Sequence, residues 1–179
     1  KAGNNPRRTS TQVRQPANRA TDTNMTATAK LLVELIALPS VNPGFLPARH
    51  PHAGERRVAE FLAAVVARAG LDVEFQNFSA GRSNLLARLQ PAGKVQQTIL
   101  LAPHLDTVNV VDARQLTPVV RSGKISGRGA CDTKGSVAVF VSALCELAQA
   151  KDRPRGTEIV FVGLADEEWG QAGSRAFAK

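Results

Sequence analysis

Five residues of this chain have side chains that could hold a metal ion and activate a water molecule. They fall in three short clusters, which are far apart in the sequence but each contain a carboxylate. The five residues are His104, Asp106, Asp132, Glu167 and Glu168. One imidazole nitrogen together with several carboxylate oxygens suits zinc or a similar divalent ion. Whether these residues form one site depends on the elements that carry them.

The pair His104 and Asp106 follows an apolar run at 99–102, which predicts a strand buried on both faces of a parallel sheet. Such a strand carries the pair to its carboxyl end, where open α/β sheets hold their ligands. Two positions apart in extended chain, the side chains point the same way. The carboxylate can then accept one ring N–H and leave the other nitrogen for a metal. Taken alone, the pair also fits a strand-end histidine satisfied by its neighbour.

The glycine-rich segment 127–135, with the sequence GRGACDTKG, does not have the spacing of a phosphate-binding loop. A Walker loop needs Gly-Lys-Ser/Thr, whereas the order here is Lys134-Gly135-Ser136. A dinucleotide fingerprint needs glycine at the position of Asp132. The glycines instead favour a tight turn that presents this one carboxylate inward. A carboxylate has two oxygens, so it can bridge two metal ions. Two such ions can share a water molecule and lower the pKa of that water.

Glu167 and Glu168 follow the apolar run 157–164, which predicts a second buried strand. Adjacent side chains diverge in extended chain, so one glutamate can bind metal while the other takes a proton from the water. On their own, the two residues also fit a solvated acidic strand end. Three such clusters, each at a strand end or a helix start, favour one shared site at the edge of a sheet.

The periodicity of apolar residues predicts helices that alternate with strands, and hence an α/β fold. We expect a mostly parallel, mixed sheet flanked by helices. The expected helices cover 27–38, 54–69, 135–150 and a segment from about 173, and the expected strands cover 71–78, 83–89, 98–102 and 157–164, with two short strands within 116–128.

The net charge of +8 is divided between a short tail and the rest of the chain. Residues 1–24 hold five basic residues and one acidic residue, a net +4, and are rich in Asn, Thr and Pro without an apolar period. We therefore expect a disordered basic tail at 1–24. The basic residues after position 24, which leave a net charge of +4, form no basic stripe with interleaved aromatic residues. No nucleic-acid partner is therefore expected. The alternative hypothesis, that the protein binds nucleic acid, is supported by the basic tail alone.

The apolar runs and the cysteines indicate the cellular compartment of the protein. No apolar run is long enough to span a bilayer, so no membrane partner is expected. Cys131 and Cys145 form neither a CxxC motif nor a disulfide framework, which is typical of a reducing cytosol. The expected localisation is therefore cytoplasmic.

Three sequence blocks, HLDTV, GRGACDTKGS and DEEWGQAGS, resemble in their order and spacing the signature motifs of the M20 metallopeptidase/deacetylase family. This family includes acetylornithine deacetylase, succinyl-diaminopimelate desuccinylase, carboxypeptidase G2-like enzymes and aminoacylase. The resemblance begins near Leu31 and extends to the end of the sequence. It is highly specific for the family and poorly specific for the substrate.

The resemblance implies a di-zinc exopeptidase-like catalytic domain with two divalent metal ions, zinc first, with cobalt or manganese as alternatives. It implies that His104 binds one metal and Asp106 orients it, that Asp132 bridges both metals, and that Glu168 binds the second. It further implies that Glu167 is the general base and that the bond from Asp132 to Thr133 is cis. The family's lid/dimerisation domain and later ligands do not occur in this sequence. We therefore expect residues 25–179 to be the N-terminal portion of a truncated catalytic domain, and any homodimer to form through the lid domain.

The resulting prediction is an enzyme that hydrolyses an amide bond in an N-acyl amino acid or a small peptide. One alternative is an aminopeptidase of a related di-zinc fold, which would require a free α-amino group. Another is a non-catalytic remnant that binds metal or peptide. Truncation favours the remnant, whereas the intact set of five polar residues weighs against it.

Overall fold

The computed structural model describes residues 25–179, so the tail predicted at 1–24 lies outside the described residues. In chain order the elements are α1 (Ala27–Ala37), η1 (Pro43–Phe45), α2 (Arg56–Arg68), β1 (Asp72–Ser79), β2 (Arg82–Leu89), β3 (Gln97–Leu101), η2 (Ala113–Leu116), β4 (Val119–Arg121), β5 (Lys124–Ser126), α3 (Lys134–Gln149), β6 (Thr157–Gly163) and α4 (Ala172–Phe177). Each predicted helix and strand is therefore observed. No helix within 25–179 has both the length and the apolar character needed to cross a membrane.

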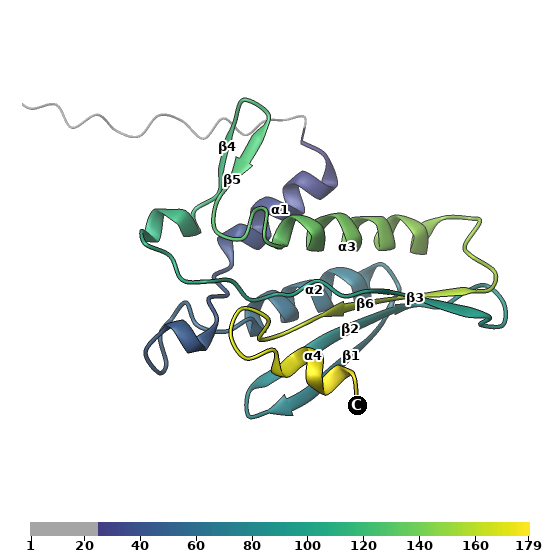
Figure 1. Cartoon of the computed structure of the whole chain (residues 1–179). Coiled ribbons are helices and arrows are strands. Elements are labelled where there is room, and N and C mark those ends of the chain that lie inside the picture. The colour runs from purple at the N-terminus through teal and green to yellow at the C-terminus, as the bar shows by residue number, and fades with distance from the viewer. Residues whose placement is uncertain (1–24) are drawn as a thin grey trace, which may run out of the picture.

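Four of the strands form one mixed sheet in the order β1-β2-β6-β3. β1 and β2 pair antiparallel, as do β2 and β6, whereas β3 and β6 run parallel. Figure 1 shows α2 and α3 over one face of this sheet and α4 against the other, with α1 packed on α3. The α/β fold with a mixed sheet flanked by helices is confirmed, and of the three strand pairings in this sheet the β3–β6 pairing is the parallel one. The parallel pair matters most for function, because its two carboxyl ends meet at one edge.

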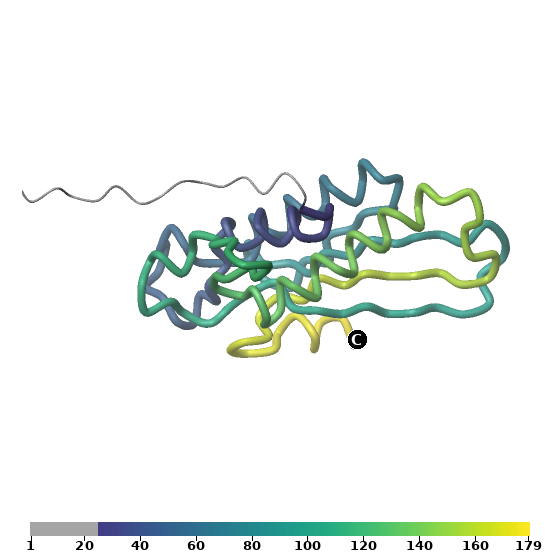
Figure 2. Tube along the Cα trace, turned by 90° about the horizontal axis from the view of Figure 1, so that it is seen from above, coloured from purple at the N-terminus to yellow at the C-terminus, as the bar shows by residue number. Residues whose placement is uncertain are grey.

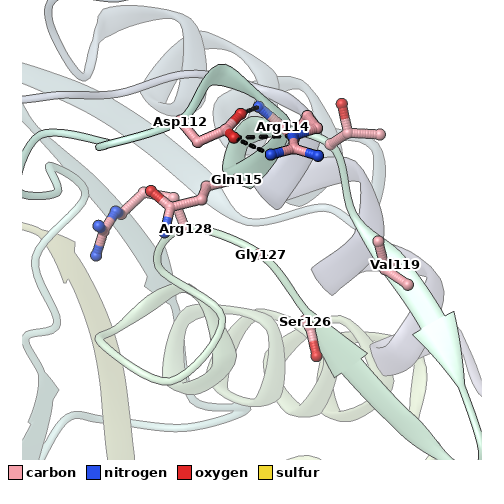
Figure 3. Close-up of a pocket in the computed structure, with 8 residues that line it drawn as sticks. Asp112, Arg114, Gln115, Val119, Ser126, Gly127 and Arg128 are labelled. Carbon is pink, nitrogen blue, oxygen red and sulfur yellow. Dashed lines mark hydrogen bonds and ion pairs between the residues drawn. The ribbon is translucent and has the colours of Figure 1, made fainter.

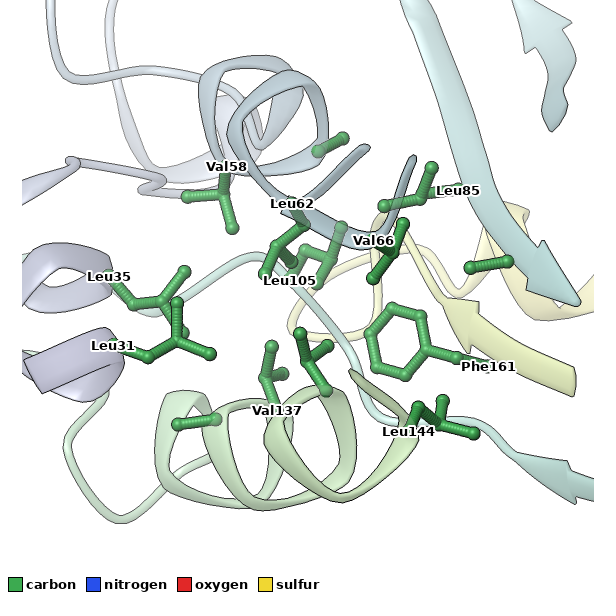
Figure 4. Packing of buried hydrophobic residues seen from close by; sticks show 14 of the residues in the cluster. Leu31, Leu35, Val58, Leu62, Val66, Leu85, Leu105, Val137, Leu144 and Phe161 are labelled. Atoms are coloured by element: carbon green, nitrogen blue, oxygen red, sulfur yellow. The ribbon is translucent and has the colours of Figure 1, made fainter. Parts of the chain in front are cut away.

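The two faces of the sheet are both apolar, because successive side chains of a strand point to opposite sides. Leu85 and Phe161 lie in the main core under α1, α2 and α3. Leu86 and Val162 belong to a second cluster, against which Phe177 of α4 packs. Figure 4 shows side chains from the three large helices converging on the sheet residues of the main core. This packing on both faces makes the central strands a rigid base for the residues that follow them.

The strand β3 is less buried than its apolar sequence predicts. Ile99 is 46% exposed and Leu100 is 52% exposed, so the prediction of a strand buried on both faces is wrong. The reason is its position: β3 is the outermost strand of the described sheet, with β6 as its neighbour there. Figure 2 shows β3 and β6 running side by side along the molecule.

The start of α3 is fastened to the end of α1 by one buried lysine. Lys134 Nζ donates hydrogen bonds to the carbonyl oxygens of Leu35, at 2.8 Å, and Leu38, at 2.7 Å. The Leu35 carbonyl also accepts the Leu38 N–H at 3.2 Å. The Leu38 carbonyl lies past the last turn of the helix, where carbonyl groups have no partner within the helix, and the lysine supplies one. Burial lowers the pKa of Lys134 to about 7. The contact fixes the backbone directly after Asp132, at the point where the metal-binding candidates meet.

Candidate metal centre

The carboxyl ends of β3 and β6 stay paired beyond the strands themselves. Leu105 N donates to Leu164 O at 2.8 Å, and Leu164 N donates to Pro103 O at 2.9 Å. His104 therefore leaves the sheet next to the segment that carries Glu167 and Glu168. Ligand atoms of these three side chains all lie within 4.8 Å of one another. The structure thus brings two of the three predicted clusters together.

The two glutamates converge, which corrects the expectation that their side chains diverge. That expectation assumed extended chain after β6, but residues 167–170 form a turn. The turn begins at Asp166, whose φ of 68° lies in the left-handed region. Because the backbone bends here, both carboxylates reach toward His104. Glu167 is the more exposed of the two.

His104 presents its two ring nitrogens to different partners. Nδ1 lies 3.0 Å from the main-chain oxygen of Asp106 and 3.6 Å from its carboxylate. Nε2 lies 3.0 Å from Asp132 Oδ1 and 3.8 Å from Glu167 Oε2. Burial opposes protonation of the ring, but hydrogen bonds to Asp106 and Asp132 outweigh it and raise the pKa of His104 to about 9. Nε2 is therefore the nitrogen that faces the carboxylates, and Nδ1 is the one held in position.

Asp106 is buried and does more than contact His104. Its Oδ1 accepts the Glu167 N–H and its Oδ2 accepts the Glu168 N–H, both at 3.1 Å. Asn42 Nδ2 donates to Oδ2 at 2.6 Å. Burial would raise the pKa of Asp106, but these hydrogen bonds and the contact with His104 hold it below its usual value. The Asp106 carboxylate thus connects the segment after β3, which carries His104, with the turn that carries Glu167 and Glu168.

Asp132 joins the cluster from a third segment, just before α3. Its side chain is 78% exposed and touches His104 Nε2. The peptide bond from Asp132 to Thr133 is cis, as the family resemblance implied. The three predicted clusters therefore meet at one edge of the sheet, with Asp132 at its open side.

The donor set fits a divalent cation on chemical grounds. Within residues 25–179, the ion pairs of Glu167 and Asp132 are with His104, and no Lys or Arg pairs with either of them or with Glu168. Burial and the neighbouring carboxylates raise the pKa of Glu168, although His104 opposes the shift. A carboxylate such as that of Glu168, whose charged form is disfavoured by burial and by neighbouring negative charge, gains from a bound cation. An imidazole with carboxylates and without thiolate is a common ligand set for zinc.

Four residues that the sequence analysis did not select form a hydrogen-bonded network next to this centre. Asn42 also donates to Asp166 Oδ1 at 2.9 Å. Arg82 Nη1 donates to the same Asp166 oxygen at 3.0 Å, and Arg82 Nε donates to Glu55 Oε1 at 3.0 Å. A chain of polar contacts, buried except at the partly exposed Arg82, therefore runs from Glu55 through Arg82, Asp166 and Asn42 to Asp106.

A cavity of about 580 Å³ lies in another part of the described chain, between η2 and the β4–β5 hairpin. Figure 3 shows its lining, with Asp112 paired to Arg114 and with Gly127 and Arg128 along one wall. None of the five candidate residues lines it. The metal centre is therefore an open acidic edge rather than this cavity.

Imidazole and carboxylate side chains thus gather at the carboxyl ends of the parallel strands of a mixed α/β sheet, an arrangement that can hold a divalent metal ion. Residues 100–179 match the family model described as Peptidase family M20/M25/M40. The chain is therefore similar to this family over the segment that carries all five candidate residues.

The comparisons with individual proteins agree with this assignment. The chain is 35% identical over 155 residues to a succinyl-diaminopimelate desuccinylase of Variovorax paradoxus, a match covering 80% of this chain and 36% of that protein. The crystal structure of human carnosine dipeptidase 1 matches with a TM-score of 0.65 and 21% identity, covering 84% of this chain and 34% of the other. Aminopeptidase PepT from Bacillus cereus matches with a TM-score of 0.64 and 25% identity, covering 84% and 39%. The chain spans about a third of the length of the curated relatives it matches.

Proposed function

We propose that the protein to which this chain belongs hydrolyses an amide bond in an N-acyl amino acid or a small peptide, with bound divalent metal. The observation that carries the proposal is the convergence of His104, Glu167 and Glu168 ligand atoms within 4.8 Å. Similarity to the M20 peptidase family supports the reaction type, and a relative named as a desuccinylase supports the N-acyl substrate.

The position of each residue suggests its role in metal binding or proton transfer. His104 Nε2 and Glu168 would hold metal, and Asp132, at the open side of the centre, would serve both ions. Asp106 keeps His104 oriented through Nδ1. Zinc, with cobalt or manganese as alternatives, would polarise the scissile carbonyl and lower the pKa of a water molecule. Glu167 takes a proton from the attacking water and delivers it to the departing amine.

Glu167 suits the role of base because its carboxylate is near His104 and its side chain is exposed to solvent. Its carboxylate lies 3.8 Å from His104 Nε2, and its side chain is 46% exposed. Glu168, the more buried neighbour, suits the role of ligand. A base must reach both the water and the leaving group, whereas a ligand benefits from being held.

The test is metal removal and restoration on the full-length protein, assayed with a panel of N-acetyl and N-succinyl amino acids and matched dipeptides. We expect chelation to abolish hydrolysis and Zn²⁺ or Co²⁺ to restore it. Hydrolysis that is insensitive to chelation would overturn the metal-dependent mechanism. Absence of hydrolysis on the whole panel, with metal bound, would favour a binding protein.

A second candidate, an aminopeptidase, is favoured by the structural match to PepT. The same panel separates the two. An aminopeptidase requires a free α-amino group, so it cleaves a dipeptide but not the N-acetylated form of that dipeptide. Cleavage of N-acyl amino acids that lack a free amine would exclude it.

A further inference from the structure

Trp169 directly follows the glutamate pair, and its indole packs on a loop that is distant in the sequence. A Cβ atom built on Gly44 would clash with indole Cδ2 of Trp169. The ring of Phe45 meets the indole edge to face, with centroids 5.1 Å apart and an angle of 88° between the ring planes. The turn that carries Glu167 and Glu168 is therefore braced against η1 by an aromatic contact.

The same η1 segment also holds the turn at its other end. Its N-cap residue, Asn42, accepts the Gly44 N–H through Oδ1 at 2.9 Å. The amide nitrogen of Asn42 donates to Asp106 and to Asp166, which precedes the glutamate pair. The two glutamates thus lie between a polar anchor at Asp166 and an apolar anchor at Trp169. Both anchors rest on the segment 42–45.

Gly44 is required here by space rather than by backbone conformation. Its φ lies outside the left-handed region, so an alanine would adopt the same backbone angles without strain. The atoms nearest to an added methyl group all belong to the indole of Trp169. A Gly44→Ala substitution is therefore a direct way to push the indole away while leaving the rest of the turn chemically unchanged.

Trp169 is 64% exposed, so its contacts bury little surface and contribute little to global stability. A residue that packs on one side only, next to the candidate base Glu167 and the candidate metal ligand Glu168, affects the local backbone more than the whole fold. We propose that Trp169 is a positioning residue, whose packing on Gly44 and Phe45 fixes the turn of Glu167 and Glu168 and thereby sets metal affinity. The link to metal rests on the proposed function, whereas the link to the turn does not.

The experiment compares the wild-type chain with Trp169→Ala, Gly44→Ala and the double variant. The first readout is hydrogen exchange of the Glu167 and Glu168 amides, which donate to Asp106. Each single substitution should speed this exchange about tenfold while core amides exchange as before. The double variant should match Trp169→Ala, because the added methyl group then meets no indole. Additive effects, or unchanged exchange in both single variants, would overturn the proposal.

The second readout is the affinity for Co²⁺, measured by calorimetry. Each single variant should bind about tenfold more weakly than wild type, again without additivity in the double variant. Since Trp169 is the single tryptophan and the chain has no tyrosine, its emission spectrum reports directly whether Gly44→Ala displaces the indole. Val111→Ala, at a highly exposed apolar position, serves as the matched control and should change none of these values.

The two readouts separate failure of this proposal from failure of the proposed function. If the wild-type chain binds no Co²⁺, the metal centre is refuted for this chain, and amide exchange still decides whether Trp169 fixes the turn. If wild type binds Co²⁺ and Trp169→Ala binds it equally well, the positioning role is refuted and the metal centre stands.

Discussion

Asn42 and Asp106 are 64 residues apart in the chain, and their side chains share a hydrogen bond of 2.6 Å. The other hydrogen of the same amide group goes to Asp166. Both carboxylates are buried, and both have pKa values below the usual range despite burial, because hydrogen bonds favour their charged forms. A neutral donor between two charged acceptors stabilises them without adding a charge of its own.

This geometry predicts a large effect for Asn42→Asp, a substitution that keeps the shape of the side chain. It removes both N–H donors and brings a third carboxylate between Asp106 and Asp166. We expect a loss of about 3 kcal/mol in the free energy of unfolding, measured by urea denaturation. Asn42→Ala should cost about 2 kcal/mol, because it removes the donors without adding charge. Asn77→Asp, at an exposed position of β1, is the control, and an equal effect there would contradict the role of Asn42.

Arg82 links the same network to α2, and its loss should destabilise the fold in a pH-dependent way. The Arg82 guanidinium bridges the buried carboxylates of Glu55 and Asp166. Arg82→Gln should lower the free energy of unfolding by about 2 kcal/mol near pH 7, less than for a fully buried ion pair because the arginine is partly exposed. Chemical denaturation over a range of pH measures the effect.

The direction of that pH dependence follows from Glu55. Burial raises the pKa of Glu55 above its usual value, with Asp106 adding to the shift and Arg82 opposing it. A carboxyl group with a raised pKa contributes stability in its protonated form, and this contribution is lost as pH rises through the folded-state pKa. Without Arg82 the pKa rises further, so Arg82→Gln should cost more at about pH 7.5 than at about pH 5. Arg56→Gln, whose partner Glu60 is on the surface, should show little effect at either pH.

The elements and the five candidate residues could be predicted because both leave local signals. Apolar periodicity identifies strands and helices, and a His-x-Asp pair or a Glu pair directly after an apolar run indicates a strand end that carries chemistry. Asn42 and Arg82 leave no such signal. Their partners Asp106 and Asp166 are 64 and 84 residues away, and an asparagine in a turn has the same local pattern whether or not it binds a buried carboxylate.

The errors of prediction have the same physical origin. The apolar run of β3 fits a central strand and an edge strand equally well, and the neighbours that decide between them are not local. The convergence of Glu167 and Glu168 depends on the turn that starts at the left-handed residue Asp166, which sequence patterning does not reveal. Side-chain direction after a strand end therefore requires the structure.

The roles proposed for Glu167 and Glu168 predict opposite results for two similar substitutions. Glu167→Gln should reduce turnover of the full-length protein by about a hundredfold or more, because it removes the proton acceptor, while bound metal stays nearly unchanged. Glu168→Gln should instead weaken metal binding, because a carboxylate ligand is lost. Metal content by elemental analysis and kcat for an N-acyl amino acid give the two readouts. If Glu167→Gln loses its metal and keeps its turnover per bound ion, the two roles are reversed.

Metal binding should also stabilise the fold, because the ligands come from segments that unfolding separates. His104 lies after β3, Asp132 before α3 and Glu168 after β6. A ligand that binds the folded state alone at a hundredfold excess over its Kd adds about 2.7 kcal/mol. For a chain of this size we expect Zn²⁺ to raise the melting temperature by about 5–10 °C, and a chelator to reverse the shift. His104→Ala should abolish the shift, whereas His52→Ala, in the loop before α2, should keep it. A shift of equal size in both variants would mean that Zn²⁺ binds outside this centre, and the assignment of His104 as a ligand would then be wrong.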